Sequence, residues 1–162
     1  MLLFLVFFPM LAAVCGYLIG RKDKKLRDRA VQIFCLIEFG VAASAMGLVV
    51  AGKELSAGIP GFCGFGLSFK LDGFRALYAL VASVMWLMTS FFSMEYMGSY
   101  TSRNRYRFFT LLTLGATVGV FLSADLFTTF IFFEIMSFTS YTWVAHDETP
   151  GAMRAAETYL AV

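Results

Sequence analysis

The sequence has little charge for its length. Only 15% of its 162 residues are Asp, Glu, Lys or Arg, whereas 59% are hydrophobic. A soluble domain of this size needs more charge to cover its surface. The hydrophobic residues form long blocks, and the alternating ten-residue segments typical of a membrane β-barrel are missing. The composition therefore predicts an all-α polytopic membrane protein.

The sequence also lacks the patterns that hold metals and cofactors. Its three cysteines, Cys15, Cys35 and Cys63, are widely spaced without a CxxC pair, and His146 is the single histidine. These spacings argue against a zinc site, an iron–sulfur site and a disulfide framework. The basic residues cluster at the ends of hydrophobic segments rather than on a solvated face, which argues against nucleic-acid binding. We expect no cofactor, metal or nucleic acid on this chain, and we interpret His146 as an interfacial residue.

Five hydrophobic segments are long enough to cross a bilayer, and a sixth is shorter. They lie at about residues 1–20, 31–51, 72–97, 108–124, 125–145 and 152–162. The first segment lacks the charged start of a signal peptide, so it is predicted to be a retained helix. The sixth segment is too short to span, which indicates a chain that is truncated or that continues as a separate polypeptide.

Basic residues set the predicted orientation. Six Lys or Arg lie within residues 21–29, and three more arginines lie within residues 103–107. Cytoplasmic loops of membrane proteins carry such an excess of positive charge. Both stretches are therefore placed in the cytoplasm and the N-terminus outside, in a bacterial cell membrane. Residues 52–71 form a glycine-rich outer loop whose alternating end is compatible with a short hairpin.

Local signals predict how several helices begin and pack. Asp72 and Asp125 stand where the third and fifth helices start, and a carboxylate there can accept backbone N–H groups. Arg75 follows Asp72 by three residues, within pairing reach. The turn before the fifth helix is very short, so the fourth and fifth helices must be antiparallel neighbours. Small residues at four-residue spacing predict close helix contacts: Gly40 with Ser44, Ala43 with Gly47, and Gly115 with Gly119.

The stretch from Asp125 to Trp143 is almost wholly apolar, yet it carries Glu134 at its centre. A carboxylate at that depth costs roughly 2.5 kcal/mol or more on insertion scales, and intramembrane acids are usually functional. At helical spacing, Ser137 and Tyr141 share its face toward the cytoplasmic side. We interpret Glu134 as a proton relay or charge-pairing residue that Ser137 and Tyr141 support. The alternative is a buried ion-pair partner that only fixes helix packing.

Two further groups of polar residues have two interpretations each. Thr113 and Thr117 of the fourth helix would extend the path if their face lies beside Glu134, but packing and backbone hydrogen bonding explain such threonines as well. Glu38 lies nearer the cytoplasmic end of the second helix. Two interpretations of Glu38 stay open: a functional role, or a contact with the membrane interface or with a neighbouring protein of the same complex.

The fourth and fifth helices carry a family resemblance. The run ADLFTTFIFFEIMSFTSY, preceded by RNRYRFFTLLTLGATVGVFLSA, closely resembles the antiporter-like proton-translocating subunits of respiratory complex I. The same family includes large subunits of multisubunit cation/proton antiporters and of energy-converting membrane hydrogenases. The stretch LDGFRALYALVASVMWLMTSFFSMEYM resembles their third helix, so the resemblance begins at about Leu67.

The resemblance implies an arrangement and a role. Family members contain two inverted five-helix repeats, the first of which begins at the fourth helix. Residues 1–106 would then be an N-terminal three-helix segment, and residues 107–162 the start of the first transport repeat. By motif, Glu134 matches the family's essential glutamate on the fifth helix. In the family it pairs with a lysine on a broken seventh helix, which this sequence does not contain.

The resulting prediction is a proton-translocating membrane subunit, or part of one, of a complex I-like NADH:quinone oxidoreductase. Other membrane subunits would be its partners in the lipid bilayer and would carry the redox chemistry. One alternative is a component of a multisubunit cation/proton antiporter or a membrane-bound hydrogenase. Another is a structural membrane fragment without transport activity. The parent complex and the ion, proton or sodium, stay open.

Overall fold

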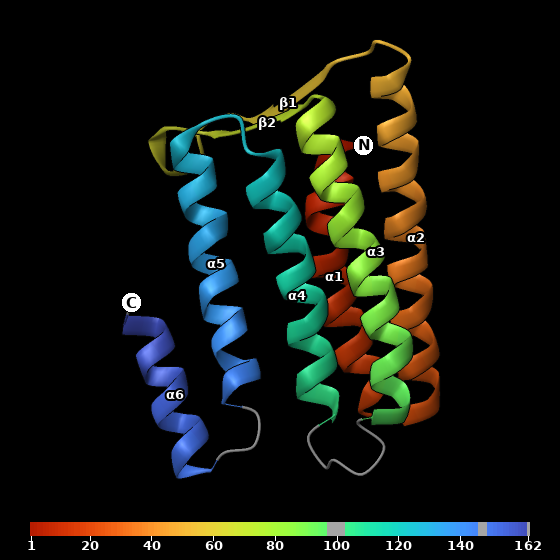
Figure 1. Cartoon of the computed structure of the whole chain (residues 1–162), viewed down its shortest axis with the longest axis vertical. Coiled ribbons are helices and arrows are strands. Elements are labelled where there is room, and N and C mark those ends of the chain that lie inside the picture. The colour runs from red at the N-terminus through yellow and green to blue at the C-terminus, as the bar shows by residue number, and fades with distance from the viewer. Residues whose placement is uncertain (97–102, 146–148, 162) are drawn as a thin grey trace.

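The computed structural model describes residues 1–96, 103–145 and 149–161. In these ranges the chain forms a bundle of helices with a two-stranded hairpin across one end (Figure 1). The elements are α1 (Leu2–Gly20), α2 (Lys24–Val50), β1 (Leu55–Ile59), the 3₁₀ turn η1 (Phe62–Gly64), β2 (Leu67–Leu71), α3 (Gly73–Tyr96), α4 (Arg103–Leu122), α5 (Leu126–Val144) and α6 (Pro150–Ala161). The prediction of a mostly helical fold is confirmed, and so is the short hairpin expected within residues 52–71. The turn predicted at His146, Asp147 and Glu148 lies outside the described residues.

Three described helices, α1, α2 and α3, are long and apolar enough to cross a membrane by length and composition. The two helices that follow have comparable lengths, with 20 residues in α4 and 19 in α5. Arginines and threonines make α4 more polar, and Glu134 with several hydroxyl residues does the same for α5. The crossing of α4 and α5 therefore stays a prediction.

Two helices begin earlier than their hydrophobic segments. Asp23 caps α2, because its Oδ1 accepts the N–H of Lys25 at 2.8 Å and that of Leu26 at 3.2 Å. Lys, Leu and Arg have high helix propensity, so the basic stretch predicted as a loop mostly forms the first turns of α2. In the same way α4 begins at Arg103 rather than near residue 108.

Aspartate caps hold α3 and α5, as predicted. Asp72 Oδ1 accepts the backbone N–H of Arg75 at 3.0 Å, and the two side chains form an ion pair. Asp125 Oδ1 accepts the N–H of Thr128 at 2.8 Å, while its Oδ2 accepts the Thr128 hydroxyl at 2.9 Å. Each cap satisfies backbone donors that have no partner within the helix.

Helix α4 packs against α1, α3 and α5 and so occupies the centre of the described bundle (Figure 1). A Cβ added at Gly115 would lie 2.7 Å from the backbone oxygen of Val6 in α1. A Cβ at Gly119 would lie 2.3 Å from the ring of Phe132 in α5. The predicted glycine pair therefore permits close contact with two helices.

The small residues of α2 behave differently from the glycine pair of α4. A Cβ added at Gly40 or Gly47 would meet no described atom within 4 Å. The predicted close contact is thus not made by the described part of the chain. Instead α2 turns another face inward, because Cys35, Ala42 and Ala45 are its buried small residues.

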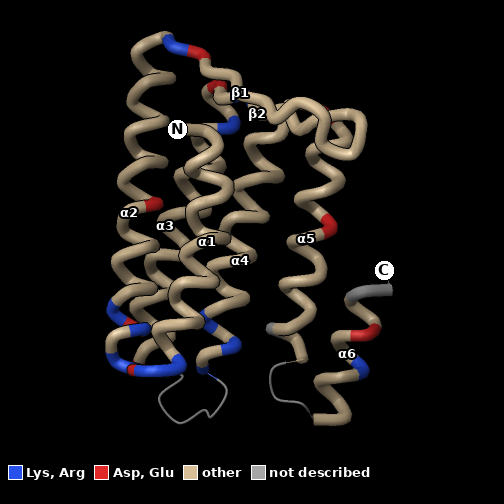
Figure 2. The backbone as a smooth tube through the Cα atoms, turned by 180° about the vertical axis from the view of Figure 1, so that it is seen from behind, with Lys and Arg blue, Asp and Glu red and all other residues tan. Residues whose placement is uncertain are grey.

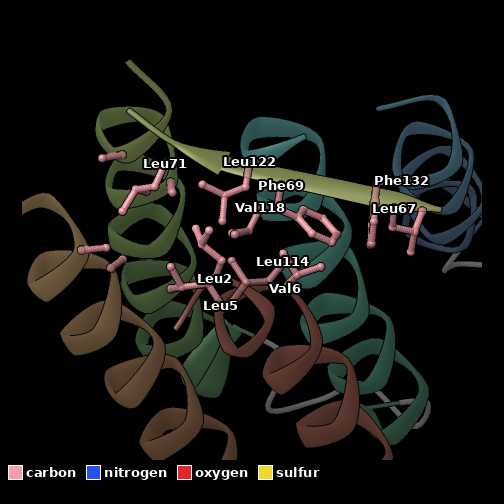
Figure 3. Packing of buried hydrophobic residues seen from close by; sticks show 14 residues of the cluster. Leu2, Leu5, Val6, Leu67, Phe69, Leu71, Leu114, Val118, Leu122 and Phe132 are labelled. Carbon is pink, nitrogen blue, oxygen red and sulfur yellow. The ribbon is translucent and has the colours of Figure 1, made fainter. Parts of the chain in front are cut away.

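The hairpin seals one end of the bundle. Leu67, Phe69 and Leu71 alternate along β2 and are buried against the helix ends. Figure 3 shows these side chains meeting residues of α1, α4 and α5. The ring of Phe69 lies 5.6 Å from that of Phe132 and 6.4 Å from that of Phe7, both in edge-to-face geometry.

Hydrogen bonds join the hairpin to the turn between α4 and α5. The N–H of Ala124 donates to the Ser68 oxygen at 2.8 Å, and the N–H of Ser68 donates to Thr128 Oγ1 at 2.9 Å. Arg75 Nε donates to the Ser123 oxygen at 3.2 Å. The hairpin and the start of α3 therefore fix the position at which α5 begins.

The cap of α5 predicts a pH-dependent stability. The N–H of Thr128 lowers the pKa of Asp125 below its ordinary value. Because the folded-state pKa lies below the unfolded one, the cap contributes stability at neutral pH. This contribution decreases as the pH falls below about 4 and is lost once the pH is below the folded-state pKa. We expect Asp125→Asn to lower the Tm at pH 7 and to have a progressively smaller effect as the pH is lowered from about 4 to about 3. Thermal unfolding of the detergent-solubilised protein across this range measures the difference. A difference that is constant with pH contradicts the prediction.

Candidate functional site

Glu134 lies midway along α5, on the side turned away from α4. The buried ring of Phe132 occupies the space beside Gly119 of α4. Glu134 follows Phe132 by two residues, or about 200° around the helix. Its side chain is half-buried, and within the described residues no hydrogen bond or ion pair holds it. The described part of the chain therefore does not make Glu134 a buried ion-pair partner.

Ser137 and Tyr141 continue from Glu134 along the same side of α5, and both are half-buried. Tyr141 lies about 10 Å along the helix from Glu134. It lines a cavity of about 390 Å³ together with Arg105, Thr142, Ala145 and Met153. Because Arg105 belongs to α4 and Met153 to α6, the cavity opens where three helices meet. The predicted line from Glu134 thus runs to a partly polar cavity.

The structure does not bring Thr113 and Thr117 to this line. They are 2% and 8% exposed, respectively, and Thr113 Oγ1 donates to the Phe109 oxygen one turn back at 2.8 Å. Gly119 marks the side of α4 that faces α5. Thr113 lies about 120° around α4 from Gly119, and Thr117 about 160°. Their geometry fits packing and backbone bonding better than a path beside Glu134.

Lys and Arg gather at the end of the bundle opposite the hairpin (Figure 2). Both stretches that the sequence analysis assigned to one side of the membrane, at the starts of α2 and α4, lie there. The cavity lined by Arg105 and Tyr141 is at this same end, because Tyr141 is in the last turns of α5. The line from Glu134 therefore leads toward the basic end.

A buried charge cluster at this end was missed by the sequence analysis. Arg27 and Arg107 have side chains only 1% and 3% exposed, and Asp28 is 14% exposed. Arg27 Nη2 lies 2.8 Å from Asp28 Oδ1, and Arg107 Nε lies 3.5 Å from the same oxygen. Arg107 Nη1 also donates to Ser93 Oγ at 2.6 Å and to the Ser90 oxygen at 3.3 Å.

This cluster corrects the interpretation that these arginines only set orientation. Arg27 and Arg107 link α2, α3 and α4 through Asp28 and the α3 serines. The sequence did contain a signal, since Arg27, Val31 and Cys35 recur every four residues on one face of α2. An arginine in that register points into the bundle.

Glu38 occupies the same inward face of α2. Its side chain is 1% exposed, and neither carboxylate oxygen has a hydrogen-bond partner among the described residues. The interpretation that Glu38 contacts the membrane interface or a neighbouring protein is therefore wrong, because its side chain is buried among the described residues. Glu38 lies between Cys35 and Ala42 on a face that packs inside the bundle, which explains its burial.

No family model matches the chain. Over 134 residues it is 28% identical to an Na(+)/H(+) antiporter subunit of Bacillus subtilis, an alignment that covers 75% of this chain and 27% of that protein. Over 166 residues it is 28% identical to a probable K(+)/H(+) antiporter subunit of Rhizobium meliloti, covering 97% of this chain and 30% of that protein. The chain thus spans less than a third of the length of these relatives.

The chain is homologous to antiporter-like membrane subunits. A solved structure has the same fold: a chain of the membrane-bound sulfane sulfur reductase, an archaeal respiratory membrane complex, matches with a TM-score of 0.89. That match has 23% sequence identity and covers 99% of this chain and 33% of the other. The predicted family is confirmed, and this antiporter-like chain is a membrane protein whose relatives are subunits of multisubunit complexes.

The buried cluster of this antiporter-like chain predicts a large effect for Asp28. Replacing Asp28 by Ala leaves Arg27 and Arg107 buried without their carboxylate, which destabilises the fold by roughly 3 kcal/mol or more. Thermal unfolding of the purified protein measures the loss.

The matched control is Glu54→Ala, which removes the partner of Lys70 in an ion pair of 3.1 Å whose side chains are 68% and 43% exposed. An exposed pair of this kind contributes about 0–1 kcal/mol. Equal effects of the two substitutions contradict a structural role for the buried cluster.

Proposed function

We propose that the chain is part of an ion-translocating subunit of a multisubunit membrane complex, and that Glu134 exchanges a proton within the membrane. The observation that carries this proposal is the half-buried carboxyl at the centre of α5, which has no partner among the described residues and lies on a line with Ser137 and Tyr141 to the Arg105 cavity. The homology to antiporter subunits supports it. A functional role would explain why the chain keeps a carboxyl at a depth where an acid is costly.

The chemistry of such a site depends on two opposing influences. Apolar surroundings in general favour the neutral form of a carboxyl. A cation that approaches the carboxyl favours its ionised form. A group between these influences gains or loses a proton when its partner moves, and Ser137 and Tyr141 provide hydroxyls between it and the cavity. The partner proposed for Glu134 is a lysine on another segment, as the family resemblance implies.

The coupled process is, in our proposal, exchange of a cation for protons. The relatives are named as Na(+)/H(+) and K(+)/H(+) antiporter subunits, which favours this class. The second candidate is proton translocation driven by a redox complex, either complex I-like or hydrogenase-like, with electron carriers on partner subunits. Its support is the fold shared with a chain of a respiratory membrane complex.

The membrane arrangement belongs to the same proposal. Five helices, α1 to α5, cross the bilayer of a bacterial cell membrane with the N-terminus outside. The support is the gathering of Lys and Arg at one end of the bundle (Figure 2), which the positive-inside rule assigns to the cytoplasm. The cavity beside Tyr141 then opens toward the cytoplasmic side.

Glu134→Gln in the full-length complex tests the proposed role. The amide keeps the shape of the side chain but has no exchangeable acid, so we expect proton flux to fall roughly a hundredfold, the scale of a positioned acid–base group. Assembly of the complex should be unchanged. Flux is measured with a pH-sensitive dye in proteoliposomes, driven first by a Na⁺ or K⁺ gradient and then by an electron donor.

The control is Glu95→Gln, since Glu95 is an exposed acid near the end of α3. It should keep the flux of the unmodified complex. Normal flux in Glu134→Gln refutes the proposal, and flux driven only by an electron donor selects the redox-driven candidate over the antiporter.

A further inference from the structure

Glu38 is a second acid inside the bundle, separate from the line of Glu134. It projects from the inward face of α2, which packs against α1 and α3, whereas α5 lies on the far side of α4 (Figure 1). Only 1% of its surface is exposed, and both of its oxygens lack a hydrogen-bond partner among the described residues. An ionised carboxylate in such a place would be a charge without compensation.

The ionisable groups around Glu38 are few in the described chain. On its own helix, Cys35 lies one turn away and is also buried. On α1, Cys15 and Tyr17 are exposed on the outer surface, and on α3 the same holds for Tyr78 and Glu95.

The cations that approach from the other elements stand further off. Arg75 of α3 is held by Asp72 at the hairpin end. Arg107 of α4 is bound by Asp28 and Ser93. No ion pair therefore reaches Glu38 among the described residues.

Buried polar residues lie between Glu38 and the basic end. Cys35 is 1% exposed and one turn from Glu38, Ser90 of α3 is fully buried, and Arg107 donates to the Ser90 oxygen at 3.3 Å. Arg107 in turn lies 3.5 Å from Asp28, whose side chain is 14% exposed. These groups follow one seam between α2, α3 and α4 from the bundle surface to Glu38.

We propose that Glu38 is an intramembrane proton-binding site, occupied by a proton at neutral pH and exchanging it with the basic end along this seam. The binding step is the addition of a proton from water to the carboxylate, which yields the neutral carboxylic acid and needs no other reactant. Burial favours the bound proton. The cluster of Arg27, Arg107 and Asp28 carries one excess positive charge, which favours its release. The site does not depend on the role assigned to Glu134.

Infrared difference spectroscopy of the full-length complex in lipid tests this site. A protonated carboxyl has a carbonyl stretch that is absent from a carboxylate and that shifts in D₂O. At pH 7, where an exposed glutamate is ionised, we expect a carboxylic acid band that is lost in Glu38→Gln and retained in Glu95→Gln and Glu134→Gln. The band should disappear as the pH is raised and should not respond to Na⁺ or K⁺ at constant pH.

Three results overturn the proposal. One is a band that is unchanged in Glu38→Gln, another is a carboxylate signal for Glu38 at pH 7, and the third is loss of the band on adding Na⁺, which would identify a cation site. If Glu38→Gln does not accumulate, Glu38→Asp serves instead, because its band should move in frequency and persist. This readout does not involve transport, so it is independent of the result for Glu134.

Discussion

A charge inside this bundle needs either a partner or a proton, and this requirement determines where the polar side chains lie. Arg27 and Arg107 are almost completely buried, yet each lies against Asp28, and Arg107 also donates to α3. Where a polar group can use the backbone, it does so, as Thr113 bonds to the carbonyl one turn back. Glu38 and Glu134, which the described residues leave without such partners, are therefore the exceptions that call for a functional explanation.

The position of Glu134 follows from packing at a distance from it. Gly119 admits the ring of Phe132, which sets the rotation of α5 against α4. The hairpin then fixes where α5 begins, through Ser68 and the Asp125–Thr128 cap. Since a helix is rigid over this length, these contacts near one end turn Glu134 away from α4 and place Tyr141 at the cavity that it lines with Arg105 and Met153. The line to the Arg105 cavity is a consequence of that rotation.

Much of this arrangement could be predicted from the sequence, because its signals are local. The aspartate caps, the short turn before α5 and the Gly115–Gly119 pair each act within a few residues, and all are found. The prediction failed where partners come from distant segments. Asp28 and Arg107 are 79 positions apart in the sequence, so their contact depends on how α2 and α4 pack. Helical spacing also left the side of α4 facing α5 undetermined, and the two interpretations of Thr113 and Thr117 stayed open for that reason.

Glu38 and Glu134 look alike in the sequence, since each is a lone acid in an apolar helix, but the bundle encloses them differently. Glu38 lies on the face of α2 that packs against α1 and α3, where it is 1% exposed, and in our proposal its proton exchanges along the seam that Cys35 and Ser90 line. Glu134 is half-buried, and the side chains of the nearby Phe130, Phe133 and Phe138 are themselves 58%, 49% and 60% exposed. An acid on such a face is suited to meet a cation from a neighbouring segment, whereas an enclosed acid is suited to hold a proton. Glutamate is thus suited to two different roles in the two helices. The difference arises from which side of each helix the rest of the bundle covers.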